Sequence, residues 1–239
     1  MEMNRKPRPT EPRQESPSSE RPADPTSLPT CGGLKLRHAR PEDAPLAAQL
    51  LYATLGPMAD YLLGNDSATE AQDILGRLFA QDANRFSYQF ASVAEGTTDI
   101  CGLLIAYPYT TMQQIRLTTA RHILRVCGVW GLTRFIWRSI PLIGIKEAEP
   151  GQYFIDAVAV LATMRGRGIG TRLLRHAEAQ AIALGRRACS LTVEINNERA
   201  SRLYMRLGYR VVEAIHIPTL ARRLGYSGLY RMVKPLNVA

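Results

Sequence analysis

The strongest local signal in this chain is Val158-Ala159-Val160-Leu161-Ala162-Thr163-Met164-Arg165-Gly166-Arg167-Gly168-Ile169-Gly170-Thr171. The pattern predicts a strand, a short loop rich in Arg and Gly, and a helix that begins near Gly168. The glycines let such a loop curl with no Cβ in the path of a ligand. Backbone N–H groups at the start of a helix, together with the positive end of its dipole, attract anions. We therefore expect this stretch to bind a pyrophosphate.

Three phosphate-binding patterns can be compared with this loop. A Walker-type loop places Lys and then Ser or Thr after its last glycine, but Thr171 and Arg172 stand there. A dinucleotide fingerprint, Gly-x-Gly-x-x-Gly, begins at Gly166 but meets Thr171 at its third glycine position. The pattern Arg/Gln-x-x-Gly-x-Gly/Ala is satisfied by Arg165, Gly168 and Gly170.

A second block follows in the chain. Residues 191–197 are β-prone and end at Asn197, a good helix N-cap, and residues 198–207 have helical character before Gly208. The block reads Asn197-x-x-Ala200-x-x-Leu203-Tyr204-x-x-x-Gly208-Tyr209. It resembles the second signature of the GCN5-related N-acetyltransferase (GNAT) superfamily, Asn-x-x-Ala-x-x-Leu-Tyr-x-x-x-Gly-Phe, and the first loop is similar to the acyl-CoA loop of the same superfamily. Two motifs in the expected order make the resemblance specific.

The resemblance implies acetyl-CoA as cosubstrate and no metal. The expected pyrophosphate-binding residues are Arg165, Gly166, Arg167, Gly168, Ile169, Gly170 and Thr171. The backbone of Val158, Ala159 and Val160 would pair with the pantetheine arm like an added strand, and an N–H near Val158 or Ala159 would stabilise the oxyanion. Asn197 would cap its helix and contact the pantetheine.

The resemblance also places a tyrosine near the sulfur of CoA, and here that residue is Tyr204. A phenol with an ordinary pKa near 10 keeps the proton that a departing thiolate needs. The alternative is that this amphipathic tyrosine only packs against the sheet. For the general base, Asp156 and Glu194 are the candidates on the strands; some relatives have their glutamate at the Thr192 position instead. His38 and His122 are weaker candidates.

Composition divides the chain into two parts. Residues 1–31 form a Pro-rich tail with few bulky apolar side chains, and such a segment is expected to be disordered. Its charges roughly cancel, so the formal net charge of +9 belongs to the predicted domain, residues 32–236. This charge suits a polyanionic cosubstrate without requiring nucleic acid. Four cysteines without paired spacing indicate a reducing compartment, and we expect a cytoplasmic protein.

Hydrophobic periodicity predicts an α/β domain with a mixed sheet of six or seven strands flanked by helices. By resemblance the sheet is GNAT-like and mostly antiparallel. The expected strands are 34–40, 87–94, 100–107, 152–160, 188–195, 209–217 and 228–233. The expected helices begin near residues 41, 68, 168 and 198, outside the insertion described next.

A basic helical insertion, residues 112–146, separates the third and fourth predicted strands. It contains no acidic residue, and Gly128, Gly131 and Pro141 argue against one continuous helix. Its basic residues are Arg116, Arg121, Arg125, Arg134, Arg138 and Lys146. One interpretation is a flap packed on the core with solvated arginines. The other is a basic amphipathic surface that contacts a membrane or a partner.

We therefore predict an N-acetyltransferase that uses acetyl-CoA and a primary amine, which is a small molecule, a protein N-terminus or a lysine. The amine attacks directly in a ternary complex. Other acyl chain lengths, a hydroxyl acceptor and a homodimer stay open. The alternative from another class is a CoA-binding regulatory or partner-binding module with the same fold.

Overall fold

The structure is a computed structural model that describes Met1 and residues 33–96 and 99–237. Except for Met1, the predicted tail of residues 1–31 therefore lies outside the described residues. Within the described residues, seven strands form one sheet in the order β1-β2-β3-β4-β5-β7-β6. The strands are β1 (Lys35–His38), β2 (Ala91–Glu95), β3 (Ile100–Pro108), β4 (Gln152–Val160), β5 (Ala188–Glu194), β6 (Arg210–His216) and β7 (Gly228–Pro235).

The pairing β4–β5 is parallel, and each of the other five strand pairings is antiparallel. The predicted mixed, mostly antiparallel GNAT-like sheet is therefore confirmed. The helices are α1 (Ala44–Leu55), α2 (Pro57–Leu62), α3 (Ala68–Phe79), α4 (Tyr109–Ser139), α5 (Ile169–Ala183), α6 (Glu198–Arg206) and α7 (Pro218–Leu224). The helical insertion between the third and fourth strands is α4, followed by the short 3-10 helix Ile140–Leu142.

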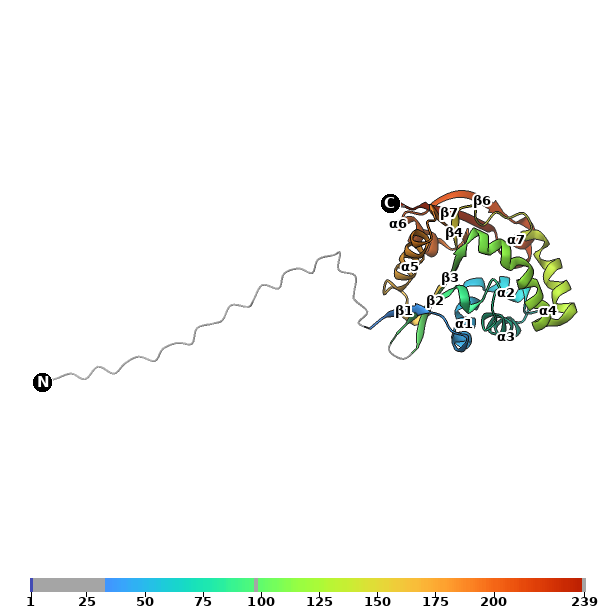
Figure 1. Ribbon diagram of the computed structural model, residues 1–239, viewed down its shortest axis with the longest axis horizontal. Coiled ribbons are helices and arrows are strands. Elements are labelled where there is room, and N and C mark those ends of the chain that lie inside the picture. The colour runs from blue at the N-terminus through green and yellow to red at the C-terminus, as the bar shows by residue number, and fades with distance from the viewer. Residues whose placement is uncertain (2–32, 97–98, 238–239) are drawn as a thin grey trace. The chain divides into compact units, whose positions relative to one another are not determined.

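Helices cover both faces of the sheet (Figure 1). On one face, buried residues of α1, α3 and α4 pack on β2, β3 and β4 around Phe79, Tyr107 and Phe154. On the other face, α5 and α6 pack around Leu173, Leu191 and Tyr209. Alternate residues of β4 therefore belong to different apolar clusters, which places the two faces of this strand in different environments.

The start of β2 and two short helices differ from the prediction. Tyr88–Phe90 form a 3-10 helix, so β2 begins at Ala91 rather than at Ser87. The hydroxyl-bearing side chain of Ser87 accepts a hydrogen bond from the N–H of Gln89 and so favours this local turn. Helices α2 and α7 were not predicted; both start at a proline, which fits the first turn of a helix.

Helix α4 consists of two helical segments, as the glycines predict. Gly128 has φ 70° and ψ −176°, which is not helical, and it separates residues 109–127 from residues 129–139. The first segment packs on the core through Ile115 and Ile123, as the flap interpretation requires. Within residues 33–96 and 99–237, none of the helices is long and apolar enough to cross a bilayer.

Two of the arginines in α4 are not simply solvated, so this part of the flap interpretation is wrong. Arg134 donates to the carbonyl of Leu63 at 3.0 Å and lies 3.6 Å from Glu70. Arg138 pairs with Asp66 at 2.9 Å. These ion pairs hold the second segment of α4 against the helices that precede it.

Candidate active site

Strands β4 and β5 separate after a short parallel pairing. Their register runs from Gln152–Ala188 to Ile155–Leu191 and then ends. Beyond this point β4 stays paired with β3 up to Val160, while β5 stays paired with β7 up to Glu194. The edge of β4 that faces β5 is therefore without a strand partner over its last residues, and its backbone groups are available to an extended ligand.

A β-bulge accompanies the separation. Ile105 pairs with Ala157 and Ala106 pairs with Ile155, so Asp156 is the additional residue of β4. A bulge bends its strand and increases its local twist. Asp156 therefore stands at the point where β4 turns away from β5.

The loop after β4 has the geometry expected of an anion site. Gly166 (φ 83°) and Gly168 (φ 75°) are in the left-handed region, and a Cβ at either position would meet open space. Gly168 is the N-cap of α5 and has no side chain to bond the first N–H groups of that helix. Arg165 and Arg167 are exposed, and Arg165 donates to the carbonyl of Val160 at 3.2 Å. The start of α5 is thus open and positively charged.

Three predicted segments meet at the start of α5. A Cβ added to Gly170 would lie 3.5 Å from Leu203 Cδ2 of α6 and 3.9 Å from Val160 Cγ2 of β4. Ile169 is buried behind them and packs tightly on β3, because a Cβ at Gly102 would lie 3.1 Å from Ile169 Cγ2. The structure therefore brings both motifs to the end of β4.

Helix α6 carries Asn197 and Tyr204. The side chain of Asn197 accepts a hydrogen bond from the N–H of Ala200 at 3.1 Å, so the predicted N-cap is confirmed. Tyr204 is half-buried, and its ring lies edge-on to Tyr209 with the centroids 6.1 Å apart. Burial raises the pKa of Tyr204 to about 12, so its phenol is protonated at neutral pH.

Asp156 belongs to a network on the opposite face of the sheet. Its Oδ1 lies 2.6 Å from Arg85 Nη2, and its Oδ2 accepts a hydrogen bond of 2.6 Å from the hydroxyl of Tyr107. Arg85 also forms a bidentate pair with Glu147, at 2.6 and 3.0 Å. Burial raises the pKa of Asp156, and the charge of Arg85 acts in the opposite direction. Both oxygens of Asp156 are thus engaged.

Glu194 lies at the end of β5. Leu191 and Val193 belong to the apolar cluster on the α5 and α6 face, so Thr192 and Glu194, which alternate with them, share the opposite face of the strand. Burial raises the pKa of Glu194 above its ordinary value of 4.5. The pKa of Tyr226 is raised by burial and then by the charges of Glu194 and Glu147. The carboxylates of Glu194 and Glu147 thus both act on the phenol of Tyr226.

Comparisons with known proteins identify the family and the fold. Residues 125–209 match the sequence profile of the Acetyltransferase (GNAT) family. The chain carries a GNAT acetyltransferase domain. Its fold is similar to a crystal structure described as an acetyltransferase, with a TM-score of 0.64 and 24% identity, over 85% of this chain and 100% of that chain.

Two further structures are similar to this GNAT domain. An N-acetyltransferase from Staphylococcus aureus Mu50 aligns with a TM-score of 0.59 and 25% identity, over 83% of this chain and 98% of that chain. Ard1 from Thermoplasma volcanium aligns with a TM-score of 0.51 and 13% identity, over 86% of this chain and 99% of that chain. Ard1 therefore supports the fold alone.

The histidines of the GNAT domain lie in other settings. His38 is on β1, three strands away from β4 in the sheet order. The Nδ1 of His122 is hydrogen-bonded with Oε1 of Gln81. His176 of α5 is half-buried beside Ser92, and burial lowers its pKa. Among the described residues, no three His, Cys, Asp or Glu side chains form a group suited to a metal ion.

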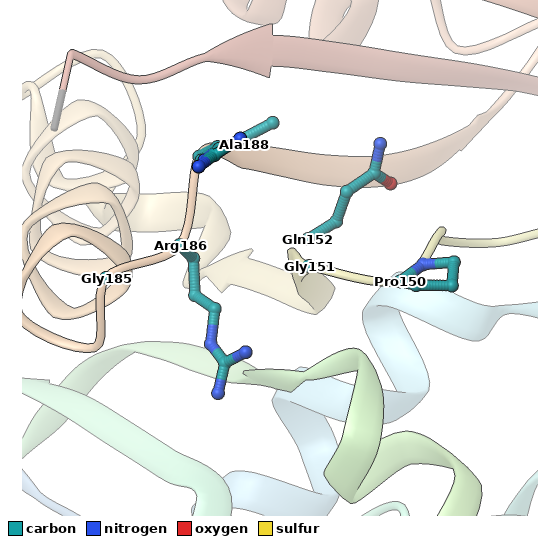
Figure 2. A pocket seen from close by; sticks show the side chains of 7 residues that line it. Pro150, Gly151, Gln152, Gly185, Arg186 and Ala188 are labelled. Atoms are coloured by element: carbon teal, nitrogen blue, oxygen red, sulfur yellow. The ribbon is translucent and has the colours of Figure 1, made fainter.

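A pocket lies at the far end of the β4–β5 pairing, where both strands begin (Figure 2). It is lined by Pro150, Gly151, Gln152, Gly185, Arg186, Arg187 and Ala188. None of these side chains is a carboxylate, an imidazole or a thiol, so this pocket has no group able to act as a general base near neutral pH. The candidate site built from the two motifs lies at the other end of β4.

Arg85, Glu147 and Tyr226 were missed in the sequence. Arg85 stands in the loop after α3, and its partner Asp156 is 71 positions further along the chain. Neither residue lies in a motif, so local patterns carry no sign of the pairing. The sequence pointed to Asp156 as a candidate, but it did not indicate Arg85 as its partner.

We expect Arg85→Ala to lower the free energy of unfolding by about 2–4 kcal/mol, because it leaves Asp156 and Glu147 without their cation. The side chain of Asp156 is 9% exposed and that of Arg85 is 35% exposed, so the effect stays below that of a fully buried pair. Arg85→Lys keeps the charge but loses the bidentate geometry and should cost less. Urea denaturation of each variant measures these changes.

A matched control is Arg77→Ala, whose exposed pair with Asp73 spans 3.7 Å. Its cost should stay under about 0.5 kcal/mol. An equal loss of stability in the Arg85 and Arg77 variants would contradict a structural role for the Arg85 network.

Proposed function

We propose that this GNAT domain is an N-acetyltransferase that transfers the acetyl group of acetyl-CoA to a primary amine in a ternary complex. The observation that carries the proposal is that both motifs meet at the end of β4, where they supply three features. They are the open start of α5, the unpaired edge of β4 and the protonated phenol of Tyr204. Placement of a thioester, activation of its carbonyl and protonation of its leaving group need these three kinds of group.

The cosubstrate would bind through backbone groups. The N–H groups from Arg165 to Thr171 would bind the pyrophosphate, with Arg165 and Arg167 adding positive charge. The pantetheine arm would then extend along the β5-facing edge of β4, from Val160 towards Val158. This orientation brings the thioester to the point where β4 bulges at Asp156.

Acyl transfer would proceed by direct attack. The amine nitrogen forms a bond to the thioester carbon, and an N–H near Val158 or Ala159 stabilises the oxyanion. The C–S bond then breaks, and Tyr204 gives its proton to the departing thiolate. The amine loses a proton to the base, so the products are an amide and free CoA.

We propose Glu194 as the general base. Its raised pKa makes it a better proton acceptor than an ordinary glutamate, and it is half-exposed. Both oxygens of Asp156 already accept hydrogen bonds, which fits a residue that positions the bulge and the network around it. The amine would approach from the side of the sheet where Glu194 lies.

The other function class is a CoA-binding module without turnover. Incubation with acetyl-CoA and a panel of polyamines, amino acids, aminoglycosides and peptide N-termini separates the two classes, because only an enzyme releases free thiol in proportion to amine. The same panel with propionyl-CoA tests the acyl chain length. Binding of acetyl-CoA without thiol release for any acceptor would favour the module. The cytoplasmic location and the primary-amine acceptor remain parts of this proposal.

Gly170→Glu should weaken acetyl-CoA binding about a hundredfold or more. Its side chain would enter the space between Val160 and Leu203 and bring a negative charge to the diphosphate. Gly170→Ala is the matched control, because its Cβ makes ordinary contacts of 3.5 and 3.9 Å. Isothermal titration calorimetry measures both dissociation constants. An unchanged constant in the glutamate variant would refute the loop assignment.

Tyr204→Phe should lower kcat by about 10²–10⁴-fold, the usual contribution of a general acid. The dissociation constant of acetyl-CoA should change little, because the ring remains. Tyr230→Phe, a half-buried tyrosine on β7, is the control. Steady-state kinetics with an accepted amine measures kcat. Equal turnover in wild type and Tyr204→Phe would remove the acid role.

Glu194→Gln should abolish the acidic limb of the pH profile of kcat/KM. The base works when it is deprotonated, and a raised pKa means that activity falls on acidification at a pH above 4.5. Glu198→Gln, an exposed glutamate on α6, should leave the limb unchanged. Rates measured from pH 5 to 9 test this. If the acidic limb of the profile persists in Glu194→Gln, Glu194 is not the base and Asp156 becomes the candidate.

A further inference from the structure

The second segment of α4 and the residues that follow it expose an apolar surface that we call the tryptophan face. Its residues are Val129, Trp130, Ile136, Trp137, Ile140 and Ile143. Trp130 is 86% exposed, Trp137 is 77% exposed and Ile143 is 75% exposed. Bulky apolar side chains that cluster on a surface indicate an interaction site, whereas scattered ones do not.

Helical spacing makes this face continuous. Val129 and Ile136 are seven positions apart, as are Trp130 and Trp137, so these four residues belong to one stripe of the helix. Ile140 follows directly, at the start of the 3-10 helix Ile140–Leu142. The opposite side of the same segment packs on the domain through Leu132, Phe135 and the ion-paired Arg134 and Arg138. The stripe therefore lies on the side of the segment that faces away from the core.

The helix that carries this face is also positively charged. Arg116, Arg121 and Arg125 of the first α4 segment are exposed, and Leu117 and Leu124 are exposed among them. Residues 112–146 contain no acidic side chain. Arg134 and Arg138 form ion pairs with Glu70 and Asp66. The exposed arginines of the first segment are therefore the ones that we expect to meet the negative charges of a partner.

We propose that α4 docks this protein on an anionic lipid bilayer. Exposed tryptophans favour the interface of a membrane, where an indole meets both the acyl chains and the headgroups. Each arginine near an anionic leaflet adds an attraction that decays within a Debye length. A bilayer of this kind matches both features: the apolar stripe enters the headgroup region, and the arginines meet lipid phosphates and carboxylates.

The same features disfavour a second copy of this chain as the occupant. Two α4 helices face to face would bring the exposed arginines of both copies together, and the segment supplies no acid to pair with them. The docking is peripheral, because the described helices are too short or too polar to span a bilayer. It is independent of the acetyltransferase reaction proposed above.

The tryptophans themselves report on this proposal. The chain contains two tryptophans, and both belong to the tryptophan face. Vesicles of phosphatidylcholine with phosphatidylserine should shift the emission of the full-length protein to shorter wavelength, and brominated lipids should quench it. Vesicles of phosphatidylcholine alone should have a much smaller effect.

Two sets of variants separate the apolar and the charged contributions. Trp130→Ala with Trp137→Ala should reduce co-sedimentation with the anionic vesicles more than tenfold. Arg116→Glu, Arg121→Glu and Arg125→Glu together should reduce it on the order of a hundredfold or more. Arg206→Glu, Arg210→Glu and Arg222→Glu change the net charge equally at exposed positions elsewhere and should bind vesicles far better than the α4 variant.

Circular dichroism checks that each variant is folded, which the exposure of the changed side chains predicts. The absence of an emission shift with anionic vesicles would overturn the proposal. So would vesicle binding that falls equally in the two arginine variants, because net charge rather than α4 would then explain it. Self-association through α4, seen by analytical ultracentrifugation as a dimer that the tryptophan variant abolishes, would identify a second copy as the occupant instead.

Discussion

The separation of β4 from β5 is the constraint on which the rest of the candidate site depends. Both strands remain in the sheet, but each is held by its other neighbour, β3 for β4 and β7 for β5. The bulge at Asp156 bends β4 at the same point. Backbone N–H and C=O groups in the interior of a sheet are normally paired, and an unpaired buried group costs free energy. A ligand that offers its own amides can satisfy the edge of β4, so the gap in the sheet is itself a reason for binding.

The two faces of the sheet differ in charge around this gap. On the α5 and α6 face, the glycine loop presents N–H groups and exposed arginines, which suits a diphosphate. On the other face stand Asp156, Glu147 and Glu194, with Arg85 neutralising part of their charge. An anionic cosubstrate and a cationic amine would therefore approach the end of β4 from opposite sides. In the reaction proposed above, this arrangement would keep the two substrates apart until their reacting atoms meet.

The sequence predicts what depends on local patterns. Strand β4 and the cap Asn197 follow from alternation and capping chemistry, and the structure has both at the expected residues. The division of α4 at Gly128 follows from backbone freedom. What could not be predicted depends on contacts between distant segments. Arg85 lies in an irregular loop, and it is held there because its N–H donates to Thr119 of α4 at 3.0 Å. No periodicity encodes such a contact.

Helix α4 therefore has two sides with different roles. Thr119 on its buried side supports the loop of Arg85, and through Arg85 it supports the carboxylates beside the β4 bulge. Arg134 and Arg138 anchor the second segment to α3 and to the turn before it. Because these contacts already stabilise the helix, its exposed tryptophans are not needed for folding. Exposed aromatic residues lower the solubility of a monomer and do not stabilise its fold. Their presence on an anchored helix is therefore better explained by binding than by packing.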